Sequence, residues 1–378
     1  MTSQQPERLI PLDSLRAIAI LSVVFYHYFF FWTPASRGAP LVAYGDAFAG
    51  IPFVAVDYLG VNLFFVISGF VILLTLERTT NMREFFLGRA ARLWPPLIIF
   101  GTVTMLIVTA FGPPELRVGW QEYSLSLLLL PPQHAAMMTG ASGWKWLDGA
   151  YWSLFVEVKF YVVIGLLYFA FPKRVVTAWL GFELLTILVG LQAHFVGGRR
   201  WDMLDGFLFE PFVPYFSFGI ASYAIFSGRR SASVLVLTGI AIAHVCFTIL
   251  TDSLRSPLTN YDVWGQVVIG HIAIFGIFYL FAWRGINFKL LSWAPLARVG
   301  RASYGIYLLH QNVGITILSL PLLTAPLLGL VGACAVAFGI AVTAILVFER
   351  LERPLLAYLR QRLLKSNFHR QAVPDPLS

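Results

Sequence analysis

The amino-acid sequence predicts an all-α integral membrane protein: a bundle of about ten transmembrane helices with both termini in the cytoplasm. Hydrophobic residues make up 58% of the chain and charged residues only 12%, whereas a soluble domain carries about 25% charged residues. Charge is missing from ten apolar blocks, each near the length of about 20 residues that a helix needs to cross a bilayer. Lysine and arginine are also distributed unevenly among the loops between these blocks.

The apolar blocks follow one another along the chain, and polar segments separate them. None shows sustained alternation of apolar and polar residues, so helices rather than barrel strands are predicted. A shorter apolar piece at 123–130, within the loop 112–148, is too short to cross and is expected to be re-entrant or interfacial. We expect the spans at 11–32, 51–76, 93–111, 149–171, 175–196, 206–227, 232–250, 263–283, 302–320 and 325–348.

The charges of the loops predict the orientation. If the N-terminus is cytoplasmic, nineteen of the 27 lysines and arginines lie on the cytoplasmic side, six lie outside and two lie within spans. Cytoplasmic loops carry such an excess, so topology explains the net charge of +8, and no nucleic-acid partner is expected. We expect a multi-pass protein of the cell's inner (plasma) membrane, with residues 1–354 as the transmembrane domain and 355–378 as a basic, partly disordered cytoplasmic tail.

Two ionisable residues, Arg16 and His27, stand out inside the first block. A charge at bilayer depth is costly, so such residues usually have a partner or a function. Arg16 and His27 are eleven residues apart, which puts them on one helix face about 16 Å apart along the axis. Arg16 lies near the cytoplasmic end and His27 near the outer end. Asp13 precedes Arg16 by three residues and can pair with it.

Two further ionisable residues, Glu157 and His310, stand out in later blocks. Glu157 is eight residues into the fourth block, about 12 Å below the outer surface, and therefore close to the expected depth of His27. An imidazole and a carboxylate at one depth can form a base and the group that orients it. His310 lies inside the ninth block. For both histidines the alternative is a structural side chain satisfied by a neighbouring helix, and it stays open.

Arg89 and Arg92 precede the third block on the cytoplasmic side. They are three residues apart and so are neighbours on one helix face, and two guanidinium groups so placed can bind a phosphate. The alternative is that arginines at the cytoplasmic border serve topology alone. No spacing of His, Cys, Asp or Glu suggests a zinc site, and no metal is expected.

Four segments together resemble the family 3 membrane acyltransferases, a group of polytopic O-acyltransferases that includes polysaccharide and lipopolysaccharide O-acetyltransferases. Residues 12–27 begin Leu-Asp-Ser-Leu-Arg and end in histidine, and residues 60–70 match the second-span signature. Residues 152–161 read Trp-Ser-Leu-Phe-Val-Glu-Val-Lys-Phe-Tyr, and residues 303–310 read Ser-Tyr-Gly-Ile-Tyr-Leu-Leu-His. Each segment alone is moderately specific, and the four in order are highly specific. The resemblance covers about residues 9–355.

The chain departs from the family pattern at two positions. Gly88 stands where the family commonly has the first arginine of Arg-Arg-x-x-Arg, which leaves Arg89 and Arg92. Asn62 stands where the family usually has aspartate. The first departure weakens the expectation of a three-arginine phosphate clamp, and the second implies that this position need not ionise.

The resemblance implies an O-acyltransferase that moves an acyl group, most often acetyl, from cytoplasmic acetyl-CoA or another acyl-CoA. The acceptor would be a hydroxyl of a cell-surface or secreted glycan or of its lipid-linked precursor. In this reading His27 is a general base or a transient acyl carrier, Glu157 orients it, and Arg16, Arg89 and Arg92 meet the CoA phosphates. Further candidate site residues are Asp13, Tyr161, Ser303, Tyr304 and His310.

A secondary transporter without covalent chemistry is the alternative function. Such a protein would also have many spans and buried ionisable residues. Against it, the sequence shows no inverted repeat and no pair of Gly- or Pro-broken helices at matching positions, which many transporter folds have.

Overall fold

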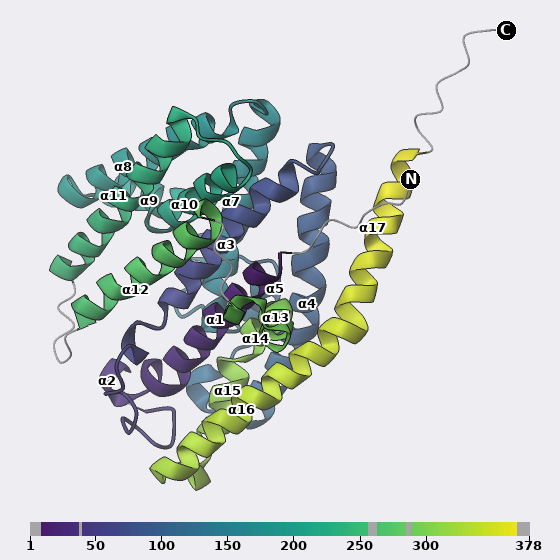
Figure 1. Ribbon diagram of the computed structural model, residues 1–378. Coiled ribbons are helices and arrows are strands. Elements are labelled where there is room, and N and C mark those ends of the chain that lie inside the picture. The colour runs from purple at the N-terminus through teal and green to yellow at the C-terminus, as the bar shows by residue number, and fades with distance from the viewer. Residues whose placement is uncertain (1–8, 38–39, 256–262, 285–288, 369–378) are drawn as a thin grey trace.

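The computed structural model describes residues 9–37, 40–255, 263–284 and 289–368, and this part of the chain consists of helices and connecting turns. Eight of its helices are long and apolar enough to cross a membrane, which confirms the prediction of an all-α, multi-pass membrane protein. Figure 1 shows them packed as one bundle. They are built on α1 (Ile10–Tyr26), α3 (Leu59–Leu76), α4 (Met82–Phe111), α7 (Trp152–Ala170), α8 (Val175–Phe195), α11 (Ala232–Arg255), α12 (Val263–Phe278) and α16 (Pro326–Val347).

The block at 206–227 forms a shorter helix than the sequence predicts. It is interrupted at Phe209, whose φ of 47° lies in the left-handed region. This residue ends α9 (Arg199–Leu208), and the chain then enters α10 (Val213–Phe226), which has 14 residues. Pro211 lies in the connecting turn and has no N–H with which to continue α9.

The block at 302–320 forms two short helices instead of one. α14 (Ser303–Leu309) and α15 (Asn312–Leu318) are separated by two residues. The backbone N–H of Asn312 donates to the carboxylate of Asp148 at 2.8 Å. This N–H is therefore satisfied outside the helix, as happens at helix ends. Eight of the ten expected spans are thus single long helices.

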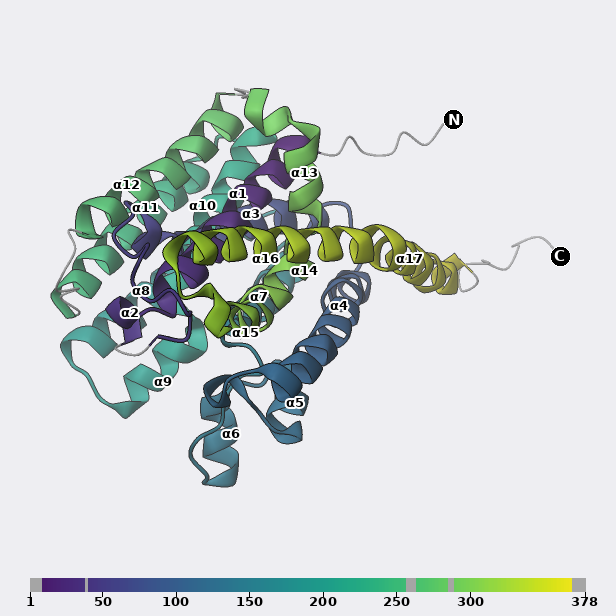
Figure 2. The same ribbon diagram turned by 90° about the horizontal axis from the view of Figure 1, so that it is seen from below.

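Segments outside the spans are helical as well. In the loop for which the sequence predicts a re-entrant or interfacial piece, α5 (Trp120–Leu127) packs against α4, where the indole N–H of Trp94 donates to the carbonyl oxygen of Leu127 at 3.1 Å. Figure 2 shows α6 (Pro132–Thr139) projecting from the bundle. The C-terminal tail, expected to be partly disordered, is helical as far as Phe368, and residues 369–378 lie outside the described residues. The remaining helices are α2 (Pro34–Arg37), α13 (Ala294–Arg301) and α17 (Arg353–Phe368).

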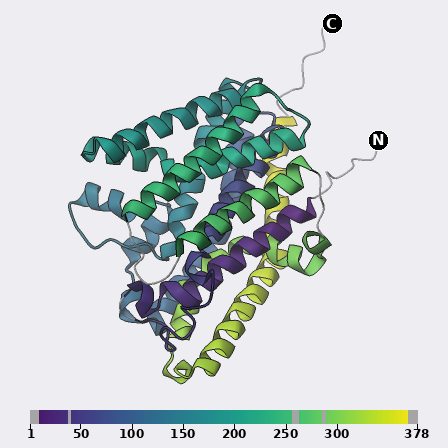
Figure 3. The ribbon, with the colours of Figure 1, turned by 60° about the vertical axis from the view of Figure 1, so that its left-hand side comes forward.

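Two faces of the bundle can be named from the turns. Glu77, after α3, forms an ion pair with Arg229, after α10, at 2.6 Å. These two turns are both predicted to be cytoplasmic, and we call their side the inner face. The opposite side, which carries α5 and α6, is the outer face. α1 begins and α17 ends at the same end of the bundle (Figure 3). That this end is cytoplasmic stays a prediction.

α1 runs through the middle of the bundle because small residues let its neighbours approach. A Cβ atom added to Gly60 of α3 would collide with the carbonyl oxygen of Ala19. One added to Gly300 of α13 would collide with the carbonyl oxygen of Asp13. Close packing of this kind drives helix association in lipid, and it fixes which turns of α1 and α3 lie at the same depth.

α3 and α10 cross at an equally close contact. A Cβ on Gly69 would collide with the carbonyl oxygen of Phe216, and one on Gly219 with that of Val66. Only glycine allows this approach of two backbones. The crossing holds α10 against α3, so that the shorter α10 still packs in the core of the bundle.

A buried polar network joins α8, α10 and α11. The Nδ1 atom of His244 lies 3.0 Å from a carboxylate oxygen of Glu183, and its Nε2 atom lies 2.8 Å from one of Glu210. Ser217 donates to Glu183 and accepts from the indole N–H of Trp179. A protonated imidazole can donate from both nitrogens, so one histidine links two carboxylates that would otherwise be costly inside a bilayer.

Candidate active site

His27 lies where α1 passes into a π-helical turn, His27–Phe31. Such turns are frequent at functional sites. The Nδ1 atom of His27 is 2.8 Å from the carbonyl oxygen of Val23. Because a carbonyl only accepts hydrogen bonds, this contact assigns the hydrogen of the neutral ring to Nδ1. Nε2 is then the nitrogen that carries the basic lone pair.

His310 is brought to His27 although the two residues are 283 positions apart. It sits in the break between α14 and α15 and is fully buried. Its Nδ1 atom is 2.8 Å from the carbonyl oxygen of Tyr307, which leaves Nε2 as an acceptor. That Nε2 lies 3.3 Å from the Nδ1 atom of His27, and the ring centroids are 4.9 Å apart. The imidazole of His27 is therefore oriented by a second imidazole.

The break that holds His310 is tied to the start of α7. Asp148, fully buried, accepts hydrogen bonds from the backbone N–H groups of Ala150 and Asn312 at 2.9 and 2.8 Å. The Tyr307 hydroxyl donates to the Ala150 carbonyl at 2.6 Å. These bonds fix the position of His310 from both sides.

A cavity of about 1150 Å³ lies beside His27 at the outer face. Glu115 and Lys145 are the residues of its described wall that carry a full charge at neutral pH. Most of the wall is aromatic or polar and neutral, as in sites that take small organic ligands. Four tryptophans line it: Trp32, Trp146, Trp152 and Trp264.

A second, narrow cavity of about 70 Å³ lies deeper in the bundle. It shares Val61 and Tyr307 with the outer cavity, so the two cavities adjoin there. The described residues that line it include six of the ten candidates named from the sequence. These are Arg16, Arg92, Glu157, Tyr161, Ser303 and Tyr304.

The three arginines gather at the inner side of this narrow cavity. Arg16 lies 3.5 Å from Asp13, as expected from their spacing. The guanidinium group of Arg89 lies over the ring of Tyr161, 5.9 Å from its centroid. Arg92 makes no hydrogen bond or ion pair with the residues that the structure describes. The guanidinium N–H groups of Arg92 are therefore available to an anionic ligand.

Glu157 has partners other than His27. It accepts a hydrogen bond from Ser68 at 3.0 Å and a short one from the hydroxyl of Tyr161. Ser68 is eight residues beyond Gly60, hence about 12 Å nearer the inner face. The contacts thus put Glu157 at the depth of Arg16, with which it interacts electrostatically. The expected placement of Glu157 beside His27 is corrected accordingly.

The physical reason is that α7 begins inside the bundle and not at its outer end. Asp148 and Tyr151, which precede it, are fully buried. The chain has thus already entered the bundle before the helix starts, and counting residues from the end of the apolar block underestimates the depth of Glu157.

Of the remaining candidates, Tyr304 donates its hydroxyl hydrogen to the carbonyl oxygen of Leu93 at 3.0 Å. Ser303, its neighbour, is buried and lines the narrow cavity. Both side chains therefore contribute to the wall between α4 and α14. Among the described residues, no group of three or more His, Cys, Asp or Glu could hold a metal ion.

Glu352 is a site residue that the sequence analysis misses. It ends the π-helical turn Phe348–Glu352, is 7% exposed, and interacts electrostatically with Arg92. Its Oε1 atom has no hydrogen-bond partner among the described residues. In the sequence, Glu352 is a glutamate just after the last apolar block. A buried glutamate at this position cannot be distinguished in sequence from one exposed to water.

Comparison with known proteins identifies the family. A family model described as "Acyltransferase domain" matches residues 10–346. The chain is 24% identical to Peptidoglycan O-acetyltransferase OatA of Listeria monocytogenes, over 82% of this chain and 50% of that protein. It is 28% identical to the Putative peptidoglycan O-acetyltransferase YrhL of Bacillus subtilis, over 82% of this chain and 49% of that protein.

A third relative, O-acetyltransferase OatA of Staphylococcus aureus, is 23% identical over 82% of this chain and 51% of that protein. The chain thus spans about half the length of the curated relatives it matches. No solved structure matches it. Because the family model covers nearly the whole of the described bundle, including both cavities and both histidines, the chain belongs to the acyltransferase 3 family of membrane proteins.

Proposed function

We propose that this protein transfers an acyl group, most often acetyl, from acyl-CoA at the inner face to a hydroxyl of a glycan at the outer face of the plasma membrane. The observation that carries the proposal is the pair of adjoining cavities. A cationic cluster lies at the inner one and an oriented imidazole at the outer one. A membrane enzyme with its donor and acceptor on opposite sides requires this arrangement.

The donor side rests on the three arginines. Arg16, Arg89 and Arg92 would bind the CoA phosphates, for which guanidinium groups are well suited. About 16 Å along α1 separates Arg16 from His27, a distance that an extended pantetheine arm suits. The narrow cavity of about 70 Å³ must widen to admit this arm, so donor binding would separate side chains at Val61 and Tyr307.

The chemistry rests on the Nε2 atom of His27. As a general base, it takes the proton of the acceptor hydroxyl while the oxygen attacks the thioester carbonyl. The carbon–sulfur bond then breaks, and the CoA thiolate leaves and takes up the proton. As a nucleophile, Nε2 first attacks the thioester carbonyl, the carbon–sulfur bond breaks and the CoA thiolate leaves. The acceptor oxygen then attacks the acyl group on Nε2, the bond between the acyl carbon and Nε2 breaks, and the hydroxyl proton passes to the thiolate. In both routes His310 accepts the Nδ1–H bond and stabilises the positive ring.

Glu157 is assigned to the donor side in this proposal. Its carboxylate lies among Arg16, Arg92 and Tyr161, where it positions cations instead of orienting His27. We expect Glu157→Gln to raise the apparent KM for acetyl-CoA and to leave the reactivity of His27 intact. A lower kcat at unchanged KM would return Glu157 to the role expected from the sequence.

The acceptor class is supported by the wall of the outer cavity and by the relatives. Sugar rings present C–H groups that pack on the electron-rich faces of aromatic side chains, and four tryptophans line the cavity. Two of the relatives are named as peptidoglycan O-acetyltransferases. A glycan, or its lipid-linked precursor, is therefore the proposed acceptor.

Radiolabelled acetyl-CoA supplied to inside-out membrane vesicles tests the function. We expect label in glycan or lipid-linked saccharide with the wild-type protein and none with His27→Ala. His194→Ala is the matched control, because His194 lies on α8 outside both cavities. Equal labelling by the His27 variant would refute the assignment. Accumulation of unmodified substrate without any covalent label would favour the transporter alternative.

A further inference from the structure

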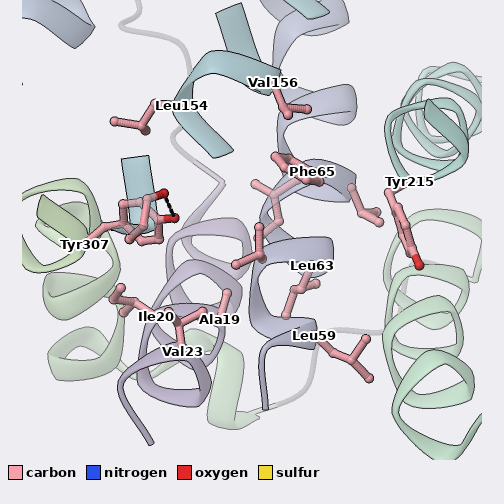
Figure 4. Packing of buried hydrophobic residues seen from close by; sticks show 14 of the residues in the cluster. Ala19, Ile20, Val23, Leu59, Leu63, Phe65, Leu154, Val156, Tyr215 and Tyr307 are labelled. Atoms are coloured by element: carbon pink, nitrogen blue, oxygen red, sulfur yellow. Dashed lines mark hydrogen bonds between the residues drawn. The ribbon is translucent and has the colours of Figure 1, made fainter. Parts of the chain in front are cut away.

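The outer cavity extends beyond the surroundings of His27. One part of its wall comes from α1, α14 and the segment before α7. Another part comes from α10, α11 and α12, and includes Tyr215, Thr248, Trp264 and His271. We call this second part the distal lobe. In Figure 4, Tyr215 and Tyr307 lie on opposite sides of α1 and α3. The distal lobe is therefore separate from the reaction centre at His27 and His310.

A polar pair is built into the distal lobe. The hydroxyl of Tyr215 and the Nε2 atom of His271 are 2.8 Å apart, and the Nδ1 atom of His271 is 2.8 Å from the carbonyl oxygen of Val267. The carbonyl fixes the ring hydrogen on Nδ1, so the tyrosine hydroxyl donates to Nε2. Tyr215 and His271 are only 4% and 6% exposed. Such polar groups are costly in a bundle inside a membrane, and the reaction at His27 does not use them.

Asn62 adds an uncharged hydrogen-bonding group between the two parts of the cavity. It lies on α3, is 8% exposed, and lines the cavity. Its amide makes no hydrogen bond with another residue in the part of the chain that the structure describes. An amide offers two N–H donors and an acceptor. A ligand with several hydroxyl groups matches this combination of donor and acceptor.

Size and charge narrow the ligand further. The cavity of about 1150 Å³ exceeds the range of about 300–1,000 Å³ that encloses a drug-sized molecule. The described lining of the distal lobe is neutral, and the charged Glu115 and Lys145 come from the segment between α4 and α7. Trp264 supplies a half-buried aromatic surface at the start of α12. The occupant of the lobe is therefore expected to be polar, uncharged and ring-shaped.

We propose that the distal lobe, with Tyr215, Trp264 and His271 in its wall and Asn62 at its border, binds a second, uncharged sugar unit of the acceptor. The acceptor is then a saccharide of at least two units: one presents its hydroxyl to His27, and its neighbour is held in the lobe. This inference rests on the proposed function, and it adds a substrate length and four specificity-determining residues to it.

The test compares acceptors of different length. Saccharides released from the envelope glycans of the source organism are separated into monosaccharide and disaccharide pools and offered to membranes with radiolabelled acetyl-CoA. We expect the wild-type protein to acetylate the disaccharide pool with at least tenfold higher kcat/KM than the monosaccharide pool. In Trp264→Ala and Tyr215→Phe this ratio should fall toward one, while the monosaccharide rate is retained.

Trp120→Ala is the matched control, because Trp120 is 69% exposed on α5 and does not line the cavity. Retained monosaccharide acetylation shows that each variant is folded. Equal use of both pools by the wild-type protein, or a ratio unchanged in the variants, would overturn the inference and leave the proposed function intact. Hydrolysis of acetyl-CoA by the wild-type protein and by His27→Ala is measured in the same membranes. If no pool is labelled and the two proteins hydrolyse acetyl-CoA equally, the proposed function itself is refuted. If no pool is labelled but the wild-type protein hydrolyses acetyl-CoA faster than His27→Ala, the saccharide acceptor and this inference are both wrong.

Discussion

At the scale of single residues, the orientation of the His27 ring is the property on which the proposed chemistry depends. The Val23 carbonyl and the Nε2 atom of His310 both lie within hydrogen-bond distance of Nδ1. Two acceptors at one nitrogen keep its hydrogen in place and leave the other nitrogen basic. When the ring takes up a proton, the same acceptors stabilise the charge of this buried side chain.

Substitution of His310 tests this role. We expect His310→Ala to lower kcat about 100-fold, because catalysis by a positioned general base contributes about 10²- to 10⁴-fold and depends on how the imidazole is oriented. The apparent KM for acetyl-CoA should stay unchanged, since the donor cluster is remote. His310→Gln restores an acceptor atom and should recover part of the activity. An unaltered kcat, or a loss that appears only in KM, would show that His310 is a structural histidine.

Arg92 allows the donor side to be tested separately. We expect Arg92→Ala to raise the apparent KM for acetyl-CoA about tenfold or more, because hydrogen bonds to charged groups contribute about 1.5–3 kcal/mol. Arg83→Ala, on the exposed surface of the same helix, is the control and should change little. Initial rates over a range of acetyl-CoA concentrations measure both. A KM for the Arg92 variant equal to that of the control would remove Arg92 from the donor site.

At the scale of elements, backbone contacts between helices decide the depth of each side chain. The crossing of α3 and α10 at Gly69 and Gly219 brings backbone against backbone. The break between α14 and α15 turns His310 toward α1 because Asp148 captures the N–H of Asn312. At the crossing, glycine takes the place of a larger side chain and brings α10 against α3. At the break, a hydrogen bond to Asp148 takes the place of a bond within the helix and positions His310.

Gly219→Ala tests the crossing. Its Cβ would collide with the Val66 carbonyl oxygen, so we expect a loss of about 1–3 kcal/mol in the free energy of unfolding. Gly239→Ala on α11 is the control, because no atom lies within 4 Å of a Cβ added there. Thermal denaturation in detergent, followed by size-exclusion chromatography, compares the two. Equal midpoints would mean that the helices can separate without cost.

At the scale of the whole molecule, the protein has two chemically different sides. Arg229, in the turn after α10, and Arg298, on α13, form ion pairs at the inner face. The outer face carries the large aromatic cavity. A group transfer across the membrane requires this polarity, and it requires the inner face to meet the cytoplasm.

Cysteine labelling tests the orientation. In a chain with Cys246 and Cys334 replaced by alanine, an impermeant maleimide should modify Lys145→Cys in intact cells. Arg230→Cys should react only after permeabilisation. Both native residues are exposed, so each engineered thiol is accessible to the reagent. The opposite labelling pattern would invert the predicted topology and with it the assignment of donor and acceptor sides.

The sequence alone determined that this protein lies in a lipid bilayer and which types of residue form its candidate site. Long apolar blocks admit only helices in a bilayer, and four motifs indicated the family together with His27, His310 and the arginines. These features depend on composition and local spacing, and both can be read directly from a short segment of the sequence. The pairing of Arg16 with Asp13 belongs to the same class, because it lies within one helical turn.

Only the tertiary structure decided which of those residues meet. His310 reaches His27 across 283 positions, and Glu157 joins the arginines because α7 begins below the surface. The distal lobe likewise combines residues of α10, α11 and α12. Helix depth and rotation follow from how closely neighbouring backbones approach, and glycine contacts and breaks set that approach. Residue spacing fixes the axial separation of two groups only within one helix, so contacts between helices had to come from the fold.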